Sequence, residues 1–150
     1  MKVFPKVGFY VLFGALSAGV ALSAHASDRV DAKLYKDRYC GCCNAYADYL
    51  DDNGFKVERI NHGNMEGVKR SLKTDKVGSC HSTIIDGYVV EGHVPAAAIH
   101  KLLSERPDIQ GIALPGMPVN SPGMGPEKPG SLQVLSVERD GRPSGVFVRL

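Results

Sequence analysis

The alternation of apolar and polar positions along the chain predicts short strands separated by helices. Runs rich in β-branched, aliphatic and aromatic residues predict strands, and apolar residues spaced three or four positions apart predict helices. The predicted strands cover residues 32–35, 55–60, 82–85, 88–91, 132–137 and 146–148, and the predicted helices cover residues 44–53 and 64–73, with a third that starts at Pro95 and ends at Pro107. Pro and Gly are frequent over residues 114–130, which predicts a loop.

The order of these elements predicts the fold class. Two strands joined by the first helix indicate a parallel pair, because a helical crossover returns the chain in the same direction. Asp86-Gly87 and Asp140-Gly141 each lie between two strand-like runs and predict antiparallel hairpins. We therefore expect an α/β protein with a thioredoxin-like fold. It would have a mixed sheet with flanking helices, the Pro/Gly-rich loop and a C-terminal hairpin.

The first 26 residues have the pattern of a secretory signal peptide. Two lysines precede an apolar run over residues 7–22, and Ala24-His25-Ala26 offers small residues to a signal peptidase. The alternative is a retained membrane anchor, but Gly and Ser residues interrupt the apolar run. We expect cleavage after Ala26, a single mature domain over residues 27–150, and export to the periplasm without a membrane anchor.

The charge balance excludes two classes of partner. The whole chain has 18 basic and 16 acidic residues, and residues 1–26 contain two of the basic ones and none of the acidic ones. The mature domain is therefore formally neutral and has no basic stripe. This argues against nucleic acids and anionic membrane surfaces as partners.

Four cysteines carry the candidate chemistry: Cys40, Cys42, Cys43 and Cys80. Exported proteins usually pair cysteines to staple distant loops, but three of these lie within four consecutive residues, which favours a redox or metal site. Cys40 and Cys43 have the spacing of a redox pair, and a thioredoxin-like fold would place them at a helix N-terminus that stabilises thiolate. The additional Cys42 favours a cradle for a soft cation. The alternative is a structural Cys40–Cys43 disulfide with a buried Cys42.

Cys80-His81 and His93 extend the candidate site. Cys80-His81 begins the first hairpin strand. In a thioredoxin-like fold this strand lies beside the turn that carries Cys40, Cys42 and Cys43, called the cysteine turn below, so Cys80 is a candidate fourth sulfur ligand. His81 is a candidate imidazole ligand, although adjacent strand residues point to opposite faces of a sheet. The alternatives are that Cys80 is a small core residue and that His93 only caps the following helix.

A short repeat in the loop reads Pro115-Gly116-Met117 and then Pro122-Gly123-Met124. Pro-Gly turns expose the residue that follows them, and thioether sulfur suits Cu(I), so both methionines are candidate copper ligands. The alternative is that both methionines plug the loop onto the domain. Thiolate, imidazole and thioether together favour Cu(I) over calcium, magnesium and zinc. Four cysteines exceed the need of one Cu(I) ion, which favours several ions held by bridging thiolates.

Taken together, these motifs resemble the CopG-like family of exported bacterial copper-resistance proteins over about residues 33–125. The motifs are Cys40-Gly41-Cys42-Cys43, Ser79-Cys80-His81, Gly87-Tyr88, Glu91-Gly92-His93-Val94-Pro95-Ala96, Pro115-Gly116-Met117-Pro118 and Ser121-Pro122-Gly123-Met124. The resemblance implies a thioredoxin-like, copper-binding domain, for which a copper oxidoreductase role has been proposed. It implies copper ligation by Cys40, Cys42, Cys43 and Cys80, and also by His81, His93, Met117 and Met124.

The leading interpretation is a periplasmic copper-binding protein for copper resistance, with possible copper redox chemistry. Two alternatives use the same residues. One is a thiol–disulfide oxidoreductase that acts through Cys40 and Cys43, and the other is a copper chaperone that delivers ions to an efflux or transfer partner.

Overall fold

The computed structural model describes residues 29–150 of the chain. The proposed signal peptide over residues 1–26 lies outside these described residues. The strands are β1 (Val30–Lys36), β2 (Phe55–Asn61), β3 (His81–Ile85), β4 (Tyr88–Glu91), β5 (Gly111–Ala113), β6 (Gln133–Val137) and β7 (Pro143–Arg149), and the helices are α1 (Gly41–Asp52), α2 (Met65–Ser71) and α3 (Ala96–Glu105). In this part of the chain, no helix is long and apolar enough to cross a membrane.

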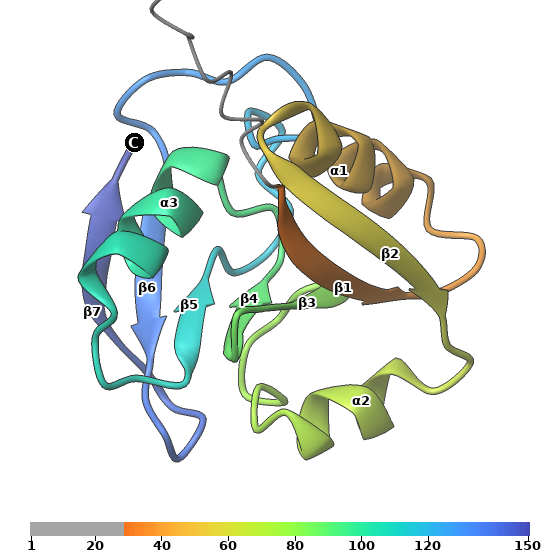
Figure 1. Cartoon of the computed structure of the whole chain (residues 1–150), viewed down its shortest axis with the longest axis horizontal. Helices are drawn as coiled ribbons and strands as arrows, with labels where there is room; N and C mark the ends of the chain where they lie inside the picture. Colours follow the sequence, from red (N-terminus) through yellow and green to blue (C-terminus); the bar gives the residue numbers. More distant parts are fainter. Residues whose placement is uncertain (1–28) are drawn as a thin grey trace, which may run out of the picture.

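The seven strands form one mixed sheet in the order β2-β1-β3-β4-β5-β6-β7 (Figure 1). β1 and β2 are parallel, as are β4 and β5, and every other neighbouring pair is antiparallel. The predicted mixed α/β class is therefore confirmed. So are both hairpins, and Asp86 and Gly87 in the first turn both have positive φ, as that type of tight turn requires.

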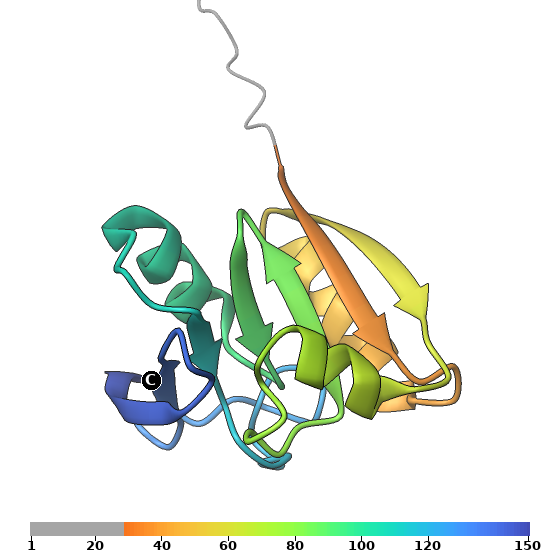
Figure 2. The ribbon, with the colours of Figure 1, turned by 90° about the horizontal axis from the view of Figure 1, so that it is seen from below.

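The helices cover both faces of the sheet (Figure 2). Leu50 of α1 and Ile99 of α3 belong to the main hydrophobic core together with Leu34 of β1 and Ile112 of β5, so these two helices cover the same face. α2 contacts β1 and β3 from the opposite face, where a second small cluster holds Val77, Ala113 and Val137. The cysteine turn lies at the end of the sheet where β1 leads into α1.

The structure corrects two of the predicted elements. The first helix begins at Gly41, not at residue 44, and its buried face uses Cys43 and Ala47, whereas Ala45 is exposed. The apolar pattern missed the first turn because cysteine and glycine carry little periodic signal. Strand β5 was not predicted, because three residues show no alternation. Its Gly111 is required where the strand crosses the carbonyl of Val89, which a Cβ atom would strike.

The predicted loop over residues 114–130 contains no helix or strand, and it packs on α1 and on the segment before Cys80. Gly116 donates its backbone N–H to the carbonyl of Gly78 at 2.7 Å, immediately before the segment that carries Cys80. At Gly123 an added Cβ would lie 2.7 Å from the backbone nitrogen of Tyr46 in α1. Both Pro-Gly turns of the repeat are therefore held against the parts of the chain that carry cysteines.

Candidate metal centre

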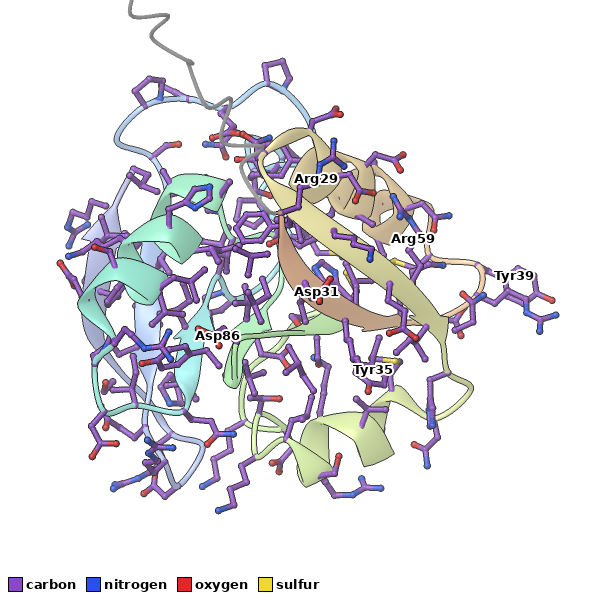
Figure 3. The ribbon with its side chains drawn as sticks, viewed as in Figure 1. Arg29, Asp31, Tyr35, Tyr39, Arg59 and Asp86 are labelled. Carbon is purple, nitrogen blue, oxygen red and sulfur yellow. A yellow bond between two sulfur atoms is a disulfide. The ribbon has the colours of Figure 1, made fainter. Side chains whose placement is uncertain are left out.

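A short turn between β1 and α1 positions Cys40, and Cys42 and Cys43 follow in the first turn of α1. The carboxylate of Asp37 accepts the N–H of Tyr39 at 2.8 Å, and the carbonyl of Asp37 accepts the N–H of Cys40 at 3.2 Å. Cys40 is thereby fixed as the N-cap residue of α1, while the Tyr39 side chain projects into solvent and is 88% exposed (Figure 3). The predicted location of the cysteines at a helix N-terminus is correct.

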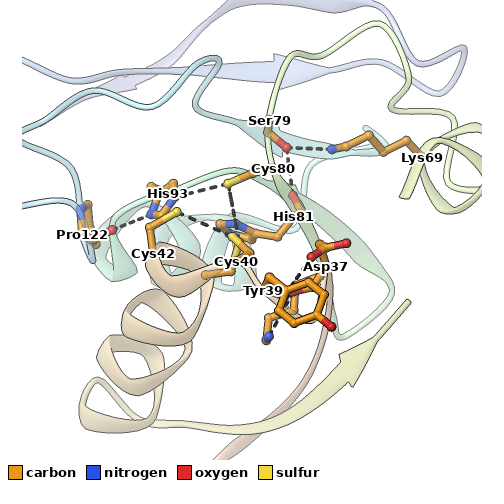
Figure 4. Close-up of a disulfide and its surroundings, with 12 residues drawn as sticks. Asp37, Tyr39, Cys40, Cys42, Lys69, Ser79, Cys80, His81, His93 and Pro122 are labelled. Carbon is orange, nitrogen blue, oxygen red and sulfur yellow. Dashed lines mark hydrogen bonds between the residues drawn. A yellow bond between two sulfur atoms is a disulfide. The ribbon is translucent and has the colours of Figure 1, made fainter. Parts of the chain in front are cut away.

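The four cysteine sulfurs form one compact group (Figure 4). All four Sγ atoms lie within 4.8 Å of one another. Cys40 and Cys43 form a disulfide, Cys42 Sγ lies 3.6 Å from Cys40 Sγ, and Cys80 Sγ lies 3.6 Å from Cys43 Sγ. Thus the tertiary fold brings Cys80 to the cysteine turn across 37 positions of sequence, as expected. Cys42 is half-buried and free, which contradicts the alternative that it is a buried core residue.

Cys80 is the sulfur at the centre of the site. It lies just before β3, and it is half-buried and free. Burial is the main cause that raises the pKa of the Cys80 thiol to about 11, and the neighbouring Cys42 raises it further. In the metal-free protein Cys80 is therefore a protonated thiol at neutral pH. It must lose its proton to bind a metal ion.

His81 is fully buried and turns its ring toward Cys80. Its Nδ1 lies 3.5 Å from Cys80 Sγ. The alternation of strand residues does not separate them, because Cys80 lies outside β3. Burial, with repulsion from His93 and Lys69, lowers the pKa of His81 to about 3, so the ring is neutral. Its Nε2 has no hydrogen-bond partner among the described residues, so no such bond at Nε2 fixes the tautomer, and either ring nitrogen, one at a time, can present its lone pair to a metal ion.

His93 faces the same sulfur from the end of the β3–β4 hairpin. Its Nε2 lies 3.6 Å from Cys80 Sγ, and its Nδ1 lies 2.7 Å from the carbonyl oxygen of Pro122. Burial also lowers the pKa of His93. The alternative role as a helix cap is wrong, since Pro95 is the N-cap residue of α3 and no side chain caps that helix.

Tyr46 forms the wall behind both histidines. Its ring centroid lies 4.7 Å from that of His81 and 5.3 Å from that of His93, and its hydroxyl donates to the carbonyl of Val94 at 2.8 Å. The sequence predicted Tyr46 as part of the apolar face of the first helix but gave it no role at the site. The signal was present, because Tyr46 lies one helical turn after Cys43.

The two methionines take different positions. Met117 is exposed, and it lines a shallow pocket together with Gly78, Ser79 and Cys80. Met124 is half-buried and follows Gly123, so it is tied to the site through the packing of Gly123 on α1. Met117 therefore lines the same pocket as Cys80, and Met124 lies in the loop that packs on α1 through Gly123.

This donor set fits a soft metal ion. Cys80, His81 and His93 offer one sulfur and two nitrogens within 4.8 Å of one another. The turn adds the free thiol of Cys42, and reduction of the disulfide would add the thiols of Cys40 and Cys43. Both imidazoles are neutral, so each has a lone pair to offer. Soft thiolates with imidazoles select Cu(I) or zinc, and neighbouring thioether favours copper.

Comparison with known proteins gives a family. Residues 77–124 match a family described as a protein of unknown function, DUF411. A solved structure of copper resistance protein CopG, Form 2, is 42% identical, with a TM-score of 0.71 over 81% of this chain and 98% of that one. Form 1 of the same protein gives a TM-score of 0.70 at the same identity and coverage. No curated protein matches the chain.

A mixed α/β domain with a group of cysteine and histidine side chains that could hold a metal ion defines a candidate metal-binding protein. The CopG structures share 42% identity with this chain over 98% of their own length. This chain therefore belongs to the CopG family of copper resistance proteins.

Proposed function

We propose that this protein binds Cu(I) and contributes to copper resistance. The observation that carries the proposal is the convergence of four sulfurs, with the neutral imidazoles of His81 and His93 at the inner side of Cys80. Reduction of the Cys40–Cys43 disulfide would free all four thiols for the metal. The name of the matched CopG structures, copper resistance protein, supports the choice of copper.

We further propose that the four cysteines hold more than one Cu(I) ion. Cys43 Sγ and Cys80 Sγ lie 3.6 Å apart, so once the disulfide is reduced a thiolate in this group is close enough to its neighbours to bridge two ions. Met117 and Met124 would then contribute outer thioether ligands; Met117 lines a pocket with Cys80 and is more exposed than Met124.

The proposed location is the periplasm, with the mature chain starting near Ser27. The leader-like pattern of residues 1–26 supports it. Mass spectrometry of periplasmic material tests it, and a protein that retains residues 1–26 would overturn it.

We also propose that β1, α1, β2, β3 and β4 form a thioredoxin-like core. The strand order β2-β1-β3-β4 and the cysteines at the start of α1 support that assignment.

One observation favours a second function, a redox role. Cys40 and Cys43 are joined while Cys42 and Cys80 remain free within 3.6 Å of them, so thiol–disulfide exchange and metal release share the same sulfurs. Such a site could couple copper oxidation state to disulfide state. A role as a chaperone for an efflux or transfer protein uses the same ligands.

The deciding experiment is a metal competition on anaerobically reduced protein. Cu(I) should displace Zn(II) at equal free concentration, and metal analysis should count more than one copper per chain, because soft sulfur ligands prefer Cu(I). The matched control is the same protein with the Cys40–Cys43 disulfide intact, which should bind fewer ions. Zinc that displaces Cu(I) would end the copper assignment.

A further inference from the structure

A buried ion pair lies on the opposite side of the sheet from the histidines. Lys69 of α2 and Glu91 at the end of β4 are joined at 2.5 Å, and their side chains are 11% and 0% exposed. Every other ion pair in residues 29–150 leaves both partners at least 29% exposed. A buried pair gains little net stability because both charges lose water. Its presence next to the metal centre therefore calls for another explanation.

The carboxylate of Glu91 holds both ends of one loop. Its Oε1 accepts the hydroxyl of Thr74 at 2.6 Å, and its Oε2 lies 2.6 Å from the hydroxyl of Ser79. The ammonium of Lys69 completes the network, since it also donates to Ser79 at 2.7 Å. Both carboxylate oxygens are satisfied, and a fully satisfied buried network is rigid.

The loop that is held in this way carries Cys80 at its end. Ser79 is the residue before Cys80, and its hydroxyl also lies 2.9 Å from the carbonyl of His81 on the other side of Cys80 (Figure 4). Glu91 itself is two residues before His93. The Glu91 carboxylate is thus linked to Cys80 and His81 through the Ser79 hydroxyl, and the Glu91 backbone is two positions from His93.

We propose that Glu91, supported by Lys69, is a positioning residue for the metal centre that fixes Cys80 against the cysteine turn through Thr74 and Ser79. The proposal rests on the copper-binding function proposed above. Residues 74–79 form no helix or strand, so without these links the segment would be held less firmly. Cys80 would then lose a constraint that keeps its sulfur 3.6 Å from Cys43 Sγ.

The test uses two pairs of variants in reduced protein, titrated with Cu(I) against a competing chelator. Ser79→Ala removes the link next to Cys80 but keeps the ion pair, and Ser71→Ala is its matched control, because Ser71 bonds only to the Val68 carbonyl in α2. Thr74→Val removes the far link, and Thr74→Ser restores the hydroxyl. We expect about tenfold weaker copper binding in Ser79→Ala and Thr74→Val and wild-type binding in the other two.

Wild-type affinity in both Ser79→Ala and Thr74→Val would overturn the positioning role. The role would also be overturned if the loss of copper affinity only followed the loss of thermal stability, so that Ser71→Ala lost as much affinity as Ser79→Ala at the same melting temperature. Rescue by Thr74→Ser separates positioning from a general loss of folding.

A metal-free measurement separates this proposal from the copper assignment. In the protein with the disulfide intact, Cys42 and Cys80 are the free thiols. Ser79→Ala should raise the alkylation rate of Cys80 relative to Cys42 by about tenfold, the effect of losing one hydrogen bond to a charged group on local opening. An unchanged ratio overturns the positioning role of Glu91. If wild-type protein binds no Cu(I), the proposed function is overturned instead, and the labelling ratio still tests the positioning role.

Discussion

The Nδ1 atom of His93 lies 2.7 Å from the carbonyl oxygen of Pro122, 29 positions further along the chain. A carbonyl can only accept, so Nδ1 carries the proton and Nε2 keeps a lone pair directed at Cys80, 3.6 Å away. A backbone acceptor of this kind orients a metal-binding histidine and fixes its tautomer. The contact makes the Pro/Gly-rich loop part of the site, and not merely a cover over it.

The two Pro-Gly turns of the loop give a matched pair of variants. Gly116 and Gly123 have φ of 76° and 75°, but an added Cβ meets nothing within 4 Å at Gly116 and lies 2.7 Å from the Tyr46 nitrogen at Gly123. Gly116→Ala should lower the free energy of unfolding by about 1–2 kcal/mol, because only the left-handed backbone is strained. Gly123→Ala should lower the free energy of unfolding, measured in urea, by more. It should also weaken Cu(I) binding, because the loop that carries Pro122 is displaced. Equal effects of the two variants on copper would refute the role of Pro122.

Cys80 and Met117 should differ sharply as copper ligands. A thiolate that bridges two ions holds both, so Cys80→Ser should lower the copper count by more than one ligand's share and weaken the remaining ions. Met117→Leu should nearly keep the count and lose about tenfold in affinity, since a neutral thioether adds little to a cation already held by thiolates. Cu(I) titration against a chelator measures both. If Cys80→Ser keeps the wild-type count and affinity, the cysteine turn binds copper alone.

The Cys80 thiol should react with alkylating reagents only at high pH. Burial first, and then Cys42, raises its pKa to about 11 from an ordinary value of 9.0. Its thiolate fraction, and hence its labelling rate, should therefore rise about tenfold per pH unit up to about pH 10. Residue-resolved mass spectrometry of the metal-free protein measures the labelling rate. Denatured protein is the control, and its labelling rate should reach a plateau at a lower pH. A plateau near pH 9 in the folded protein would contradict the burial of this thiol.

The metal-free protein should lose stability in mild acid because of His81. Its pKa is about 3 in the folded state and 6.5 in an ordinary environment, so the unfolded chain binds a proton that the folded protein rejects. Above pH 6.5 His81 does not lower the free energy of unfolding. Between pH 6 and 3 this residue should lower the free energy of unfolding by about 1.4 kcal/mol per pH unit. His81→Phe, which keeps an aromatic ring beside Tyr46, should lower that slope in urea unfolding. An identical slope in the variant would show that His81 can be protonated in the folded state.

The sequence by itself determined the local structure and the kind of chemistry. The period of apolar residues predicted all three helices and six of the seven strands, and Asp-Gly pairs marked both hairpins, because these signals act between near neighbours. Residue types alone indicated a soft metal, since sulfur and imidazole donors are inherently selective. The start of α1 and the three residues of β5 carried no such local signal.

The sequence brought Cys80 to the other cysteines only through the expected fold, and the tertiary structure decided how these donors meet. Cys80 joins Cys43 because β3 pairs with β1, and His93 turns its Nε2 to Cys80 because Pro122 returns to accept its other nitrogen. The buried pair of Lys69 and Glu91 was invisible in the sequence, where a lysine in a helix and a glutamate after a strand usually face water. Contacts between residues far apart in the chain depend on sheet pairing and loop closure, and these follow from the packing of the whole domain.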